Sequence, residues 1–365
     1  MKKWSILLVL ALLSFSSADS FARRVYVTPE QKSRLENART VLLNVLALTE
    51  KGPVDPAPFS TVVKRRLEEV GYRVVTDRAQ AHDVELLVKC EERKTPTGTT
   101  PAGGDAELPD APDRLWSGPA CLITFFVDGL NLGWAKEIRP HEKQAGQSGT
   151  GNNSEHGRGS AFVQLRNRLE EYDFPVLLMA DWGQINRLVT LLESPATPKP
   201  RKLNILSSLS EIHAPEALAH VSGLLKDPDL AEETIVALGG FGGESIPLLI
   251  DLFENSRLPT IQASAAKGLG AVAALSGDDR VIPPLHAYLH QTLENFKSVR
   301  DIDYLVLTEV VWALGKLPHK ETVPPMEDLQ SRIWLIHDTS PEMTNLREAV
   351  NWSYKQVAEA AVAVD

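Results

Sequence analysis

A leucine recurs in the second half of the chain, each time inside an apolar stretch rich in small residues. The four copies are Leu209, Leu238, Leu269 and Leu314, which lie 29, 31 and 45 residues apart and are flanked by Ser, Ala or Gly. Apolar stretches with helical spacing, such as 246–253, separate them. A period of this length is typical of paired helices stacked as repeats. The pattern therefore predicts an all-α solenoid in this half, closed by a helix over 346–361.

Short apolar runs dominate the first half and predict strands. They lie at 41–48, 72–75, 84–90, 121–127 and 133–138. Between the first two, apolar residues recur at helical spacing from Phe59 to Val70, and Gly71 follows as a helix stop. Thr28, Pro29 and Gln31 match the start of a capped helix. The pattern predicts a small mixed α/β sheet domain over 23–143, with a proline-rich turn at 52–58 and a hairpin turn at 128–131.

Two stretches show neither the hydrophobic spacing of a helix nor that of a strand. Residues 94–117 hold seven Pro or Gly residues and predict an irregular loop. Residues 144–159 are rich in Gly, Ser and Asn and predict a flexible linker. Helical spacing begins again at residue 160. The fold class expected is therefore α+β, a small mixed α/β sheet domain over 23–143 followed by an all-α, solenoid-like repeat domain over 160–365.

The first residues resemble a secretory signal. Lys2 and Lys3 precede a mostly apolar run over 4–15, and small residues follow up to Ala22. Such a run reaches about 18 Å as a helix, short of the roughly 30 Å hydrocarbon core of a bilayer. We expect a signal peptide over 1–22, a periplasmic or secreted product, and no stable membrane insertion after cleavage. An uncleaved anchor is the alternative.

The two cysteines lie on two of the expected strands. Cys90 ends the run 84–90, and Cys121 begins the run 121–127. If these strands are antiparallel neighbours, the sulfur atoms can meet, and an oxidising compartment favours a disulfide between them. Two buried free thiols are the alternative, because bonding needs Cα atoms within about 7 Å.

Charge is unevenly distributed along the chain. Residues 19–160 hold 19 basic and 20 acidic side chains, whereas residues 161–365 hold 17 and 28. Nucleic acids and anionic lipids bind through Lys and Arg, so the acidic half is a poor surface for either. It suits a basic or neutral protein partner, or its charge simply keeps the protein soluble.

The repeat half resembles a known family. Asp227 and Pro228, followed by the apolar stretch to Leu238 and then by Pro247, look like a HEAT repeat of the kind also found in phycobilisome-lyase-like proteins. The pattern returns with Pro283 and Pro284 and again with Pro324 and Pro325, and it covers about 185–335. The resemblance implies an α-solenoid in which small residues bring helices close, a Gly ends each Leu-bearing helix and a Pro starts the next. No resemblance covers the first domain.

Candidate chemical groups are sparse. His286 and His290 lie four residues apart on an expected helix, but the sequence offers no third metal ligand, so we interpret them as exposed imidazoles. The remaining candidates, with a structural role favoured for each, are Gly239 to Gly243, Gly146 with Gly151, the acids Asp278, Asp279, Asp301 and Asp303, and the tryptophans Trp312, Trp334 and Trp352, which we expect to pack the end of the repeats.

The sequence thus predicts no catalytic, cofactor-binding or metal-binding residue and no cofactor. The function expected is that of an exported, non-enzymatic scaffold for protein–protein interaction or assembly in the cell envelope. The alternative is an enzyme or enzyme subunit in which lyase-like HEAT repeats hold a ligand or a client protein. A third interpretation is a structural factor of the envelope whose first domain docks to a membrane complex.

Overall fold

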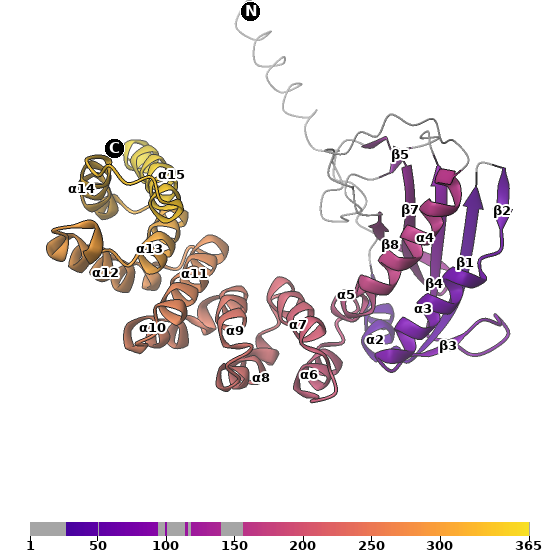
Figure 1. Cartoon of the computed structure of the whole chain (residues 1–365). Coiled ribbons are helices and arrows are strands. Elements are labelled where there is room, and N and C mark those ends of the chain that lie inside the picture. Colours follow the sequence, from indigo (N-terminus) through magenta and orange to yellow (C-terminus); the bar gives the residue numbers. More distant parts are fainter. Residues whose placement is uncertain are drawn as a thin grey trace, which may run out of the picture. The chain divides into compact units, whose positions relative to one another are not determined.

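The computed structural model describes residues 27–49, 51–93, 99–100, 114–115, 118–139 and 156–364. The chain divides into two compact units, Met1–Gln184 and Ile185–Asp365. The first holds a mixed sheet and the second is helical (Figure 1). The expected signal peptide over 1–22 and most of the linker over 144–159 lie outside the described residues.

A six-stranded mixed sheet is the centre of the first unit. Its strands are β1 (Thr40–Thr49), β2 (Gly52–Val54), β3 (Arg73–Val75), β4 (Val84–Arg93), β7 (Gly118–Val127) and β8 (Leu130–Ile138). They run in the order β2-β1-β4-β7-β8, with β3 also paired to β1. β1 is parallel to β3 and β4, and the remaining pairs are antiparallel. The strands expected from the apolar runs are all present.

Two local features of the first unit, a hairpin turn and a helix cap, follow directly from the sequence. The β7–β8 hairpin closes through Asp128 and Gly129, both with positive φ, the backbone that an Asp-Gly turn supplies. The helix α2 (Pro29–Asn37) begins with a complete capping box, because Thr28 and Gln31 bond reciprocally through side chain and backbone.

Helices α3 (Ala57–Glu69) and α4 (His156–Glu171) lie on one face of the sheet (Figure 1). α3 contacts β1 and β3, whereas α4 contacts β4, β7 and β8. Their contact includes an edge-to-face pair of Phe59 and Phe162, with ring centroids 5.3 Å apart. The strand residues facing these helices alternate with less buried ones, for example Leu86, Val88 and Cys90 on β4.

The first unit extends beyond the boundary that the sequence suggested. Gln184, after α5 (Phe174–Asp181), is buried and donates to the carbonyls of Leu35 and Ala38 at 2.6 and 3.1 Å, and the hydroxyl of Tyr72 donates to its side-chain oxygen at 3.0 Å. These bonds tie the end of α5 to the end of α2. The unit therefore ends at Gln184, and α4 and α5, which the sequence analysis assigned to the repeat half over 160–365, belong with the sheet.

Two segments expected to be irregular contain short strands. Gly52–Val54 pairs antiparallel with the end of β1, which is compatible with its Pro53 because β2 is an edge strand. Inside the 94–117 loop, β5 (Thr99–Thr100) pairs antiparallel with β6 (Arg114–Leu115). Backbone pairing over two residues leaves no periodic signal in a sequence.

The second unit is a succession of helices. They are α6 (Ile185–Glu193), α7 (Lys199–Glu211), α8 (Leu218–Gly223), α9 (Ala231–Leu238), α10 (Ile246–Asn255), α11 (Pro259–Ser276), α12 (Ile282–Asn295), α13 (Tyr304–Lys316), α14 (Val323–Trp334) and α15 (Pro341–Val364). Short 3₁₀ turns join several of them, including η4 (Gly239–Glu244) and η7 (Lys320–Thr322). Proline occupies the first turn of α10, α12 and α14, as the repeated sequence suggested.

The odd-numbered helices contact one another in series. α7 contacts α9, α9 contacts α11, α11 contacts α13, and α13 contacts α15, while each also contacts the even-numbered helix before it. The recurring leucines, Leu209, Leu238, Leu269 and Leu314, are buried in this series. The sequence therefore identified the core position of each of these helices correctly.

Glycines of the series serve close packing. A Cβ on Gly270 would lie 2.8 Å from the Cβ of Ala313, and one on Gly315 would lie 2.7 Å from the Cβ of Ser353. Both glycines lie within their helices, so the expectation that a Gly ends each Leu-bearing helix is wrong for α11 and α13. Because glycine has no side chain, each of these residues lets its helix pack closely against the next helix of the series.

Candidate functional site

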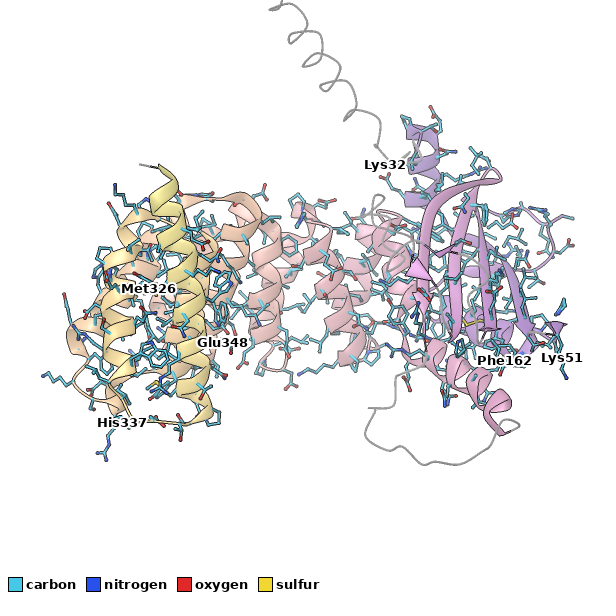
Figure 2. The ribbon with its side chains drawn as sticks, turned by 90° about the horizontal axis from the view of Figure 1, so that it is seen from above. Lys32, Lys51, Phe162, Met326, His337 and Glu348 are labelled. Atoms are coloured by element: carbon cyan, nitrogen blue, oxygen red, sulfur yellow. A yellow bond between two sulfur atoms is a disulfide. The ribbon has the colours of Figure 1, made fainter. Side chains whose placement is uncertain are left out.

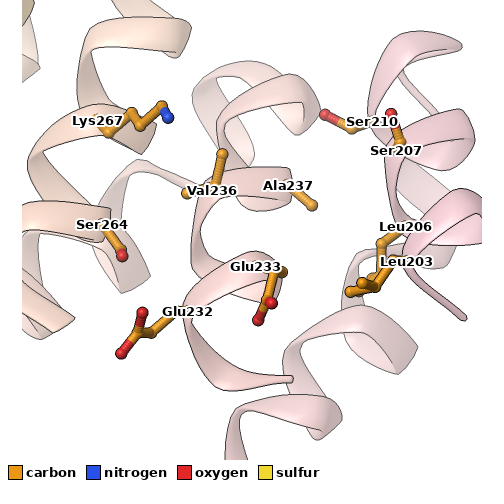
Figure 3. A pocket seen from close by; sticks show the side chains of 10 residues that line it. All are labelled: Leu203, Leu206, Ser207, Ser210, Glu232, Glu233, Val236, Ala237, Ser264 and Lys267. Atoms are coloured by element: carbon orange, nitrogen blue, oxygen red, sulfur yellow. The ribbon is translucent and has the colours of Figure 1, made fainter. Parts of the chain in front are cut away.

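A groove crosses α7, α9 and α11, three neighbouring odd-numbered helices of the second unit. Its volume is about 460 Å³, and it is lined by Leu203, Leu206, Ser207 and Ser210 of α7, Glu232, Glu233, Val236 and Ala237 of α9, and Ser264 and Lys267 of α11 (Figure 3). Its apolar side chains come from α7 and α9, and its hydroxyl and charged groups come from all three helices. This is the usual composition of a site that binds a ligand by apolar contact and orients it by polar contact.

Helical spacing explains why these residues gather. On α7, the lining residues are spaced by three or four positions and therefore share one face. The buried leucines Leu209, Leu238 and Leu269 anchor the three helices in the core. With the anchors fixed, the more polar side chains of the same helices face the groove.

The groove is electrostatically polarised. Figure 3 shows the carboxylates of Glu232 and Glu233 at one end and the ammonium group of Lys267 at the other. Within the part of the chain that the structure describes, none of these three side chains has an ion-pair partner. The position of the two glutamates in the first turn of α9 favours that helix through its dipole, which gives them a structural role as well.

A second pocket, of about 450 Å³, lies between α10, α11 and α12, but three of its polar side chains are hydrogen-bonded to nearby backbone. The side chain of Gln262 donates to the carbonyl of Phe253, that of Thr292 donates to the carbonyl of Tyr288, and Asp301 accepts from the backbone of Ser298. Burial and the Asp303 carboxylate raise the pKa of Tyr288 to about 12, so its phenol stays protonated. The first groove is therefore the better candidate.

The cysteines named by the sequence lie in the first unit. Cys90 of β4 is directly opposite Cys121 of β7, and a disulfide joins them with sulfur atoms 2.07 Å apart (Figure 2). Both residues are fully buried. The bond links two neighbouring strands and contributes to the sheet rather than to a reactive site.

The histidines differ from the expectation of two exposed imidazoles. His290 is exposed, but His286 is only 9% exposed, and its Nε2 lies 2.6 Å from the hydroxyl oxygen of Thr322. The interpretation of His286 was therefore wrong, because η7 covers the face of α12 that carries it. Across the described residues, no group of three or more His, Cys, Asp or Glu side chains has an arrangement able to hold a metal ion.

Three of the four acidic candidates have local structural partners. Asp278 and Asp303 cap the helical turns that follow them, and Asp301 accepts from the backbone of Lys297 and Ser298. Gly242 has positive φ within η4, which joins α9 to α10. The pair Gly146 and Gly151 lies outside the described residues.

The tryptophans fit the expected packing only in part. The rings of Trp312 and Trp352 lie 5.0 Å apart between α13 and α15. Trp334 is 57% exposed, so it is not part of the core. The guanidinium carbon of Arg347 lies 5.7 Å from the centroid of its ring.

Sequence reasoning missed the groove itself. Its polar residues follow no motif, and they lie in one place only because α7, α9 and α11, which α8 and α10 separate in the sequence, come side by side. The available signal was weak: small or charged residues that lie within six positions of a recurring leucine but share no common spacing from it.

In the described ranges, no helix is both long enough and apolar enough to cross a membrane. No protein-family model matches the chain, and no curated protein sequence matches it. Its function must therefore be inferred from the site.

Proposed function

We propose that the chain is an exported, non-enzymatic binding protein of the cell envelope whose second unit is a short HEAT-like α-solenoid. The serial contacts from α7 to α15 and the close approach at Gly270 and Gly315 support the solenoid, because each helix pair buries its apolar face against its neighbours. The disulfide supports export, because such bonds persist in oxidising compartments.

The groove of α7, α9 and α11 is the proposed binding surface, and an extended segment of a partner polypeptide is its proposed occupant. Packed helices lie 8–10 Å apart, so three helices offer a surface about 20 Å across. About six extended residues span that distance. A folded domain is too large for a groove of about 460 Å³.

Charge complementarity selects the occupant. A basic side chain of the segment fits beside Glu232 and Glu233, apolar side chains fit against Leu203, Leu206 and Val236, and a carboxylate fits beside Lys267. The observation that carries the proposal is this groove, which has apolar side chains and charges of both signs that have no ion-pair partner in the described residues.

Peptide binding tests the proposal. Fluorescein-labelled nine-residue peptides that combine leucine with lysine should bind the purified exported protein in a fluorescence-anisotropy titration, and matched peptides of Gly and Ser should not. The double change Glu232→Lys with Glu233→Lys should weaken binding of the lysine peptides about tenfold, equal to about 1.4 kcal/mol.

The double change Glu294→Lys with Glu327→Lys is the matched control, since both glutamates are exposed, on α12 and α14, and lie outside the groove. It should leave the affinity unchanged. Equal weakening by this control would show that net charge, rather than the groove, attracts the peptides. Failure of every peptide to bind, together with turnover of a small molecule, would support the enzyme alternative.

A further inference from the structure

Three of the nine histidines of the chain gather where η7 meets α12. The ring of His286 lies 6.2 Å from that of His290 and 6.4 Å from that of His319, measured between centroids. His286 and His290 are on α12, and His319 directly precedes η7. The cluster therefore joins two successive parts of the helical unit.

The contact between His286 and Thr322 holds this junction. Thr322 is fully buried and is the residue just before α14, yet its hydroxyl makes no capping bond to that helix and instead lies 2.6 Å from Nε2 of His286. The backbone N–H of Thr322 donates to the carbonyl of His319 at 2.9 Å. Within the described residues, Nδ1 of His319 is buried without a hydrogen-bond partner.

We propose that His286 is an acid-sensitive latch, which holds η7 and the start of α14 against α12 while its imidazole is neutral and releases them when it is protonated. A neutral imidazole has one acceptor nitrogen, and an imidazolium has two donors and none. Protonation therefore makes Nε2 a donor, so that it can no longer accept from the Thr322 hydroxyl, and it places a charge in a buried site beside two further imidazoles, which is the larger cost.

The groups around His286 determine the direction in which its pKa is shifted. Burial lowers the pKa of His286 from 6.5, the imidazoles of His290 and His319 lower it further, and the carboxylate of Glu321 in η7 opposes them. Below pH 6.5 the unfolded chain thus takes up a proton at this residue before the folded chain does. The latch contributes its full stability above pH 6.5 and loses it as the pH falls from 6.5 toward the lowered pKa.

Hydrogen exchange measured by mass spectrometry tests the latch in the full exported chain. Exchange over 282–334, corrected for intrinsic rates, should give an opening constant that is larger at pH 5.5 than at pH 7.5. The increase should approach tenfold for each unit between the folded and unfolded pKa. EDTA in both buffers keeps metal ions from bridging the imidazoles.

His286→Gln should remove most of this pH dependence, because a glutamine can still contact Thr322 but does not titrate. His220→Gln is the control: His220 is exposed and bonded to Glu193, and this variant should keep the increase. An opening constant that is unchanged by pH in the natural protein, or that rises equally in His286→Gln, would overturn the latch.

His319→Gln provides a second variant in case His286→Gln does not fold. It removes one imidazole that lowers the pKa of His286, so the increase in opening should become smaller. In addition, NMR titration of the ¹³C-labelled histidines should show one resonance whose titration midpoint lies below pH 6.5. In His319→Gln this midpoint should lie at a higher pH. The absence of such a resonance would contradict the latch.

Discussion

Replacing Gly270 by Ala tests the close packing of α11 and α13. In most helices this change stabilises by about 1 kcal/mol, because alanine has the higher helix propensity. Here the new Cβ would lie 2.8 Å from the Cβ and 2.9 Å from the Cα of Ala313. Carbon atoms prefer 3.5–4.0 Å, so the two helices must separate by about 1 Å. Overpacking of this kind costs about 1–3 kcal/mol.

Gly223→Ala is the matched control for Gly270→Ala. Gly223 is the last residue of α8, and a Cβ placed on it would meet no atom within 4 Å. This variant should gain about 0.5–1 kcal/mol. The two variants should therefore differ by about 1–3 kcal/mol, with Gly270→Ala the less stable, since helix propensity affects both alike.

Urea unfolding monitored by circular dichroism at 222 nm measures the difference between the two variants. Hydrogen exchange over 259–276 and 304–316 should place the loss in α11 and α13. Equal stability of the two variants, or a gain in Gly270→Ala, would show that α11 and α13 are not packed as described and would refute the reasoning.

Two further predictions concern the first unit. Alkylation without reductant should label neither Cys90 nor Cys121, and free alkylation of both thiols in the isolated protein would contradict the bond. Cys90→Ser should destabilise the sheet unit by about 3–4 kcal/mol, seen as a lower melting temperature, and should leave the helical unit folded. Gln184→Ala should destabilise the same unit by about 1–3 kcal/mol, because two buried carbonyls lose a donor, whereas Gln291→Ala on the exposed surface of α12 should have little effect in the same melting experiment.

Local patterns made the strands and helices predictable. The Asp128-Gly129 turn, the capping box at Thr28 and the run that ends at Cys90 each depend on a few neighbouring residues, and each is found as expected. The recurring leucines were predictable for the same reason, since one buried position per helix is enough to produce a period.

Long-range contacts were not predictable. Gln184 belongs to the first unit because it bonds to Leu35 and Ala38, which lie far from it in the sequence. His286 is buried because η7 folds back over α12, and no periodicity in α12 announces that contact. The groove was missed for the same reason, since its two carboxylates and its lysine come from different helices.

A charge swap in the groove tests the central claim most directly. The triple change Glu232→Lys, Glu233→Lys and Lys267→Glu inverts the polarity of the groove and leaves its apolar side chains unchanged. Anisotropy titrations with a leucine–lysine peptide and a leucine–glutamate peptide give the affinity ratio for each protein. We predict that the natural protein prefers the lysine peptide and that the swapped protein prefers the glutamate peptide. An unchanged ratio would contradict the claim that this groove binds the partner segment.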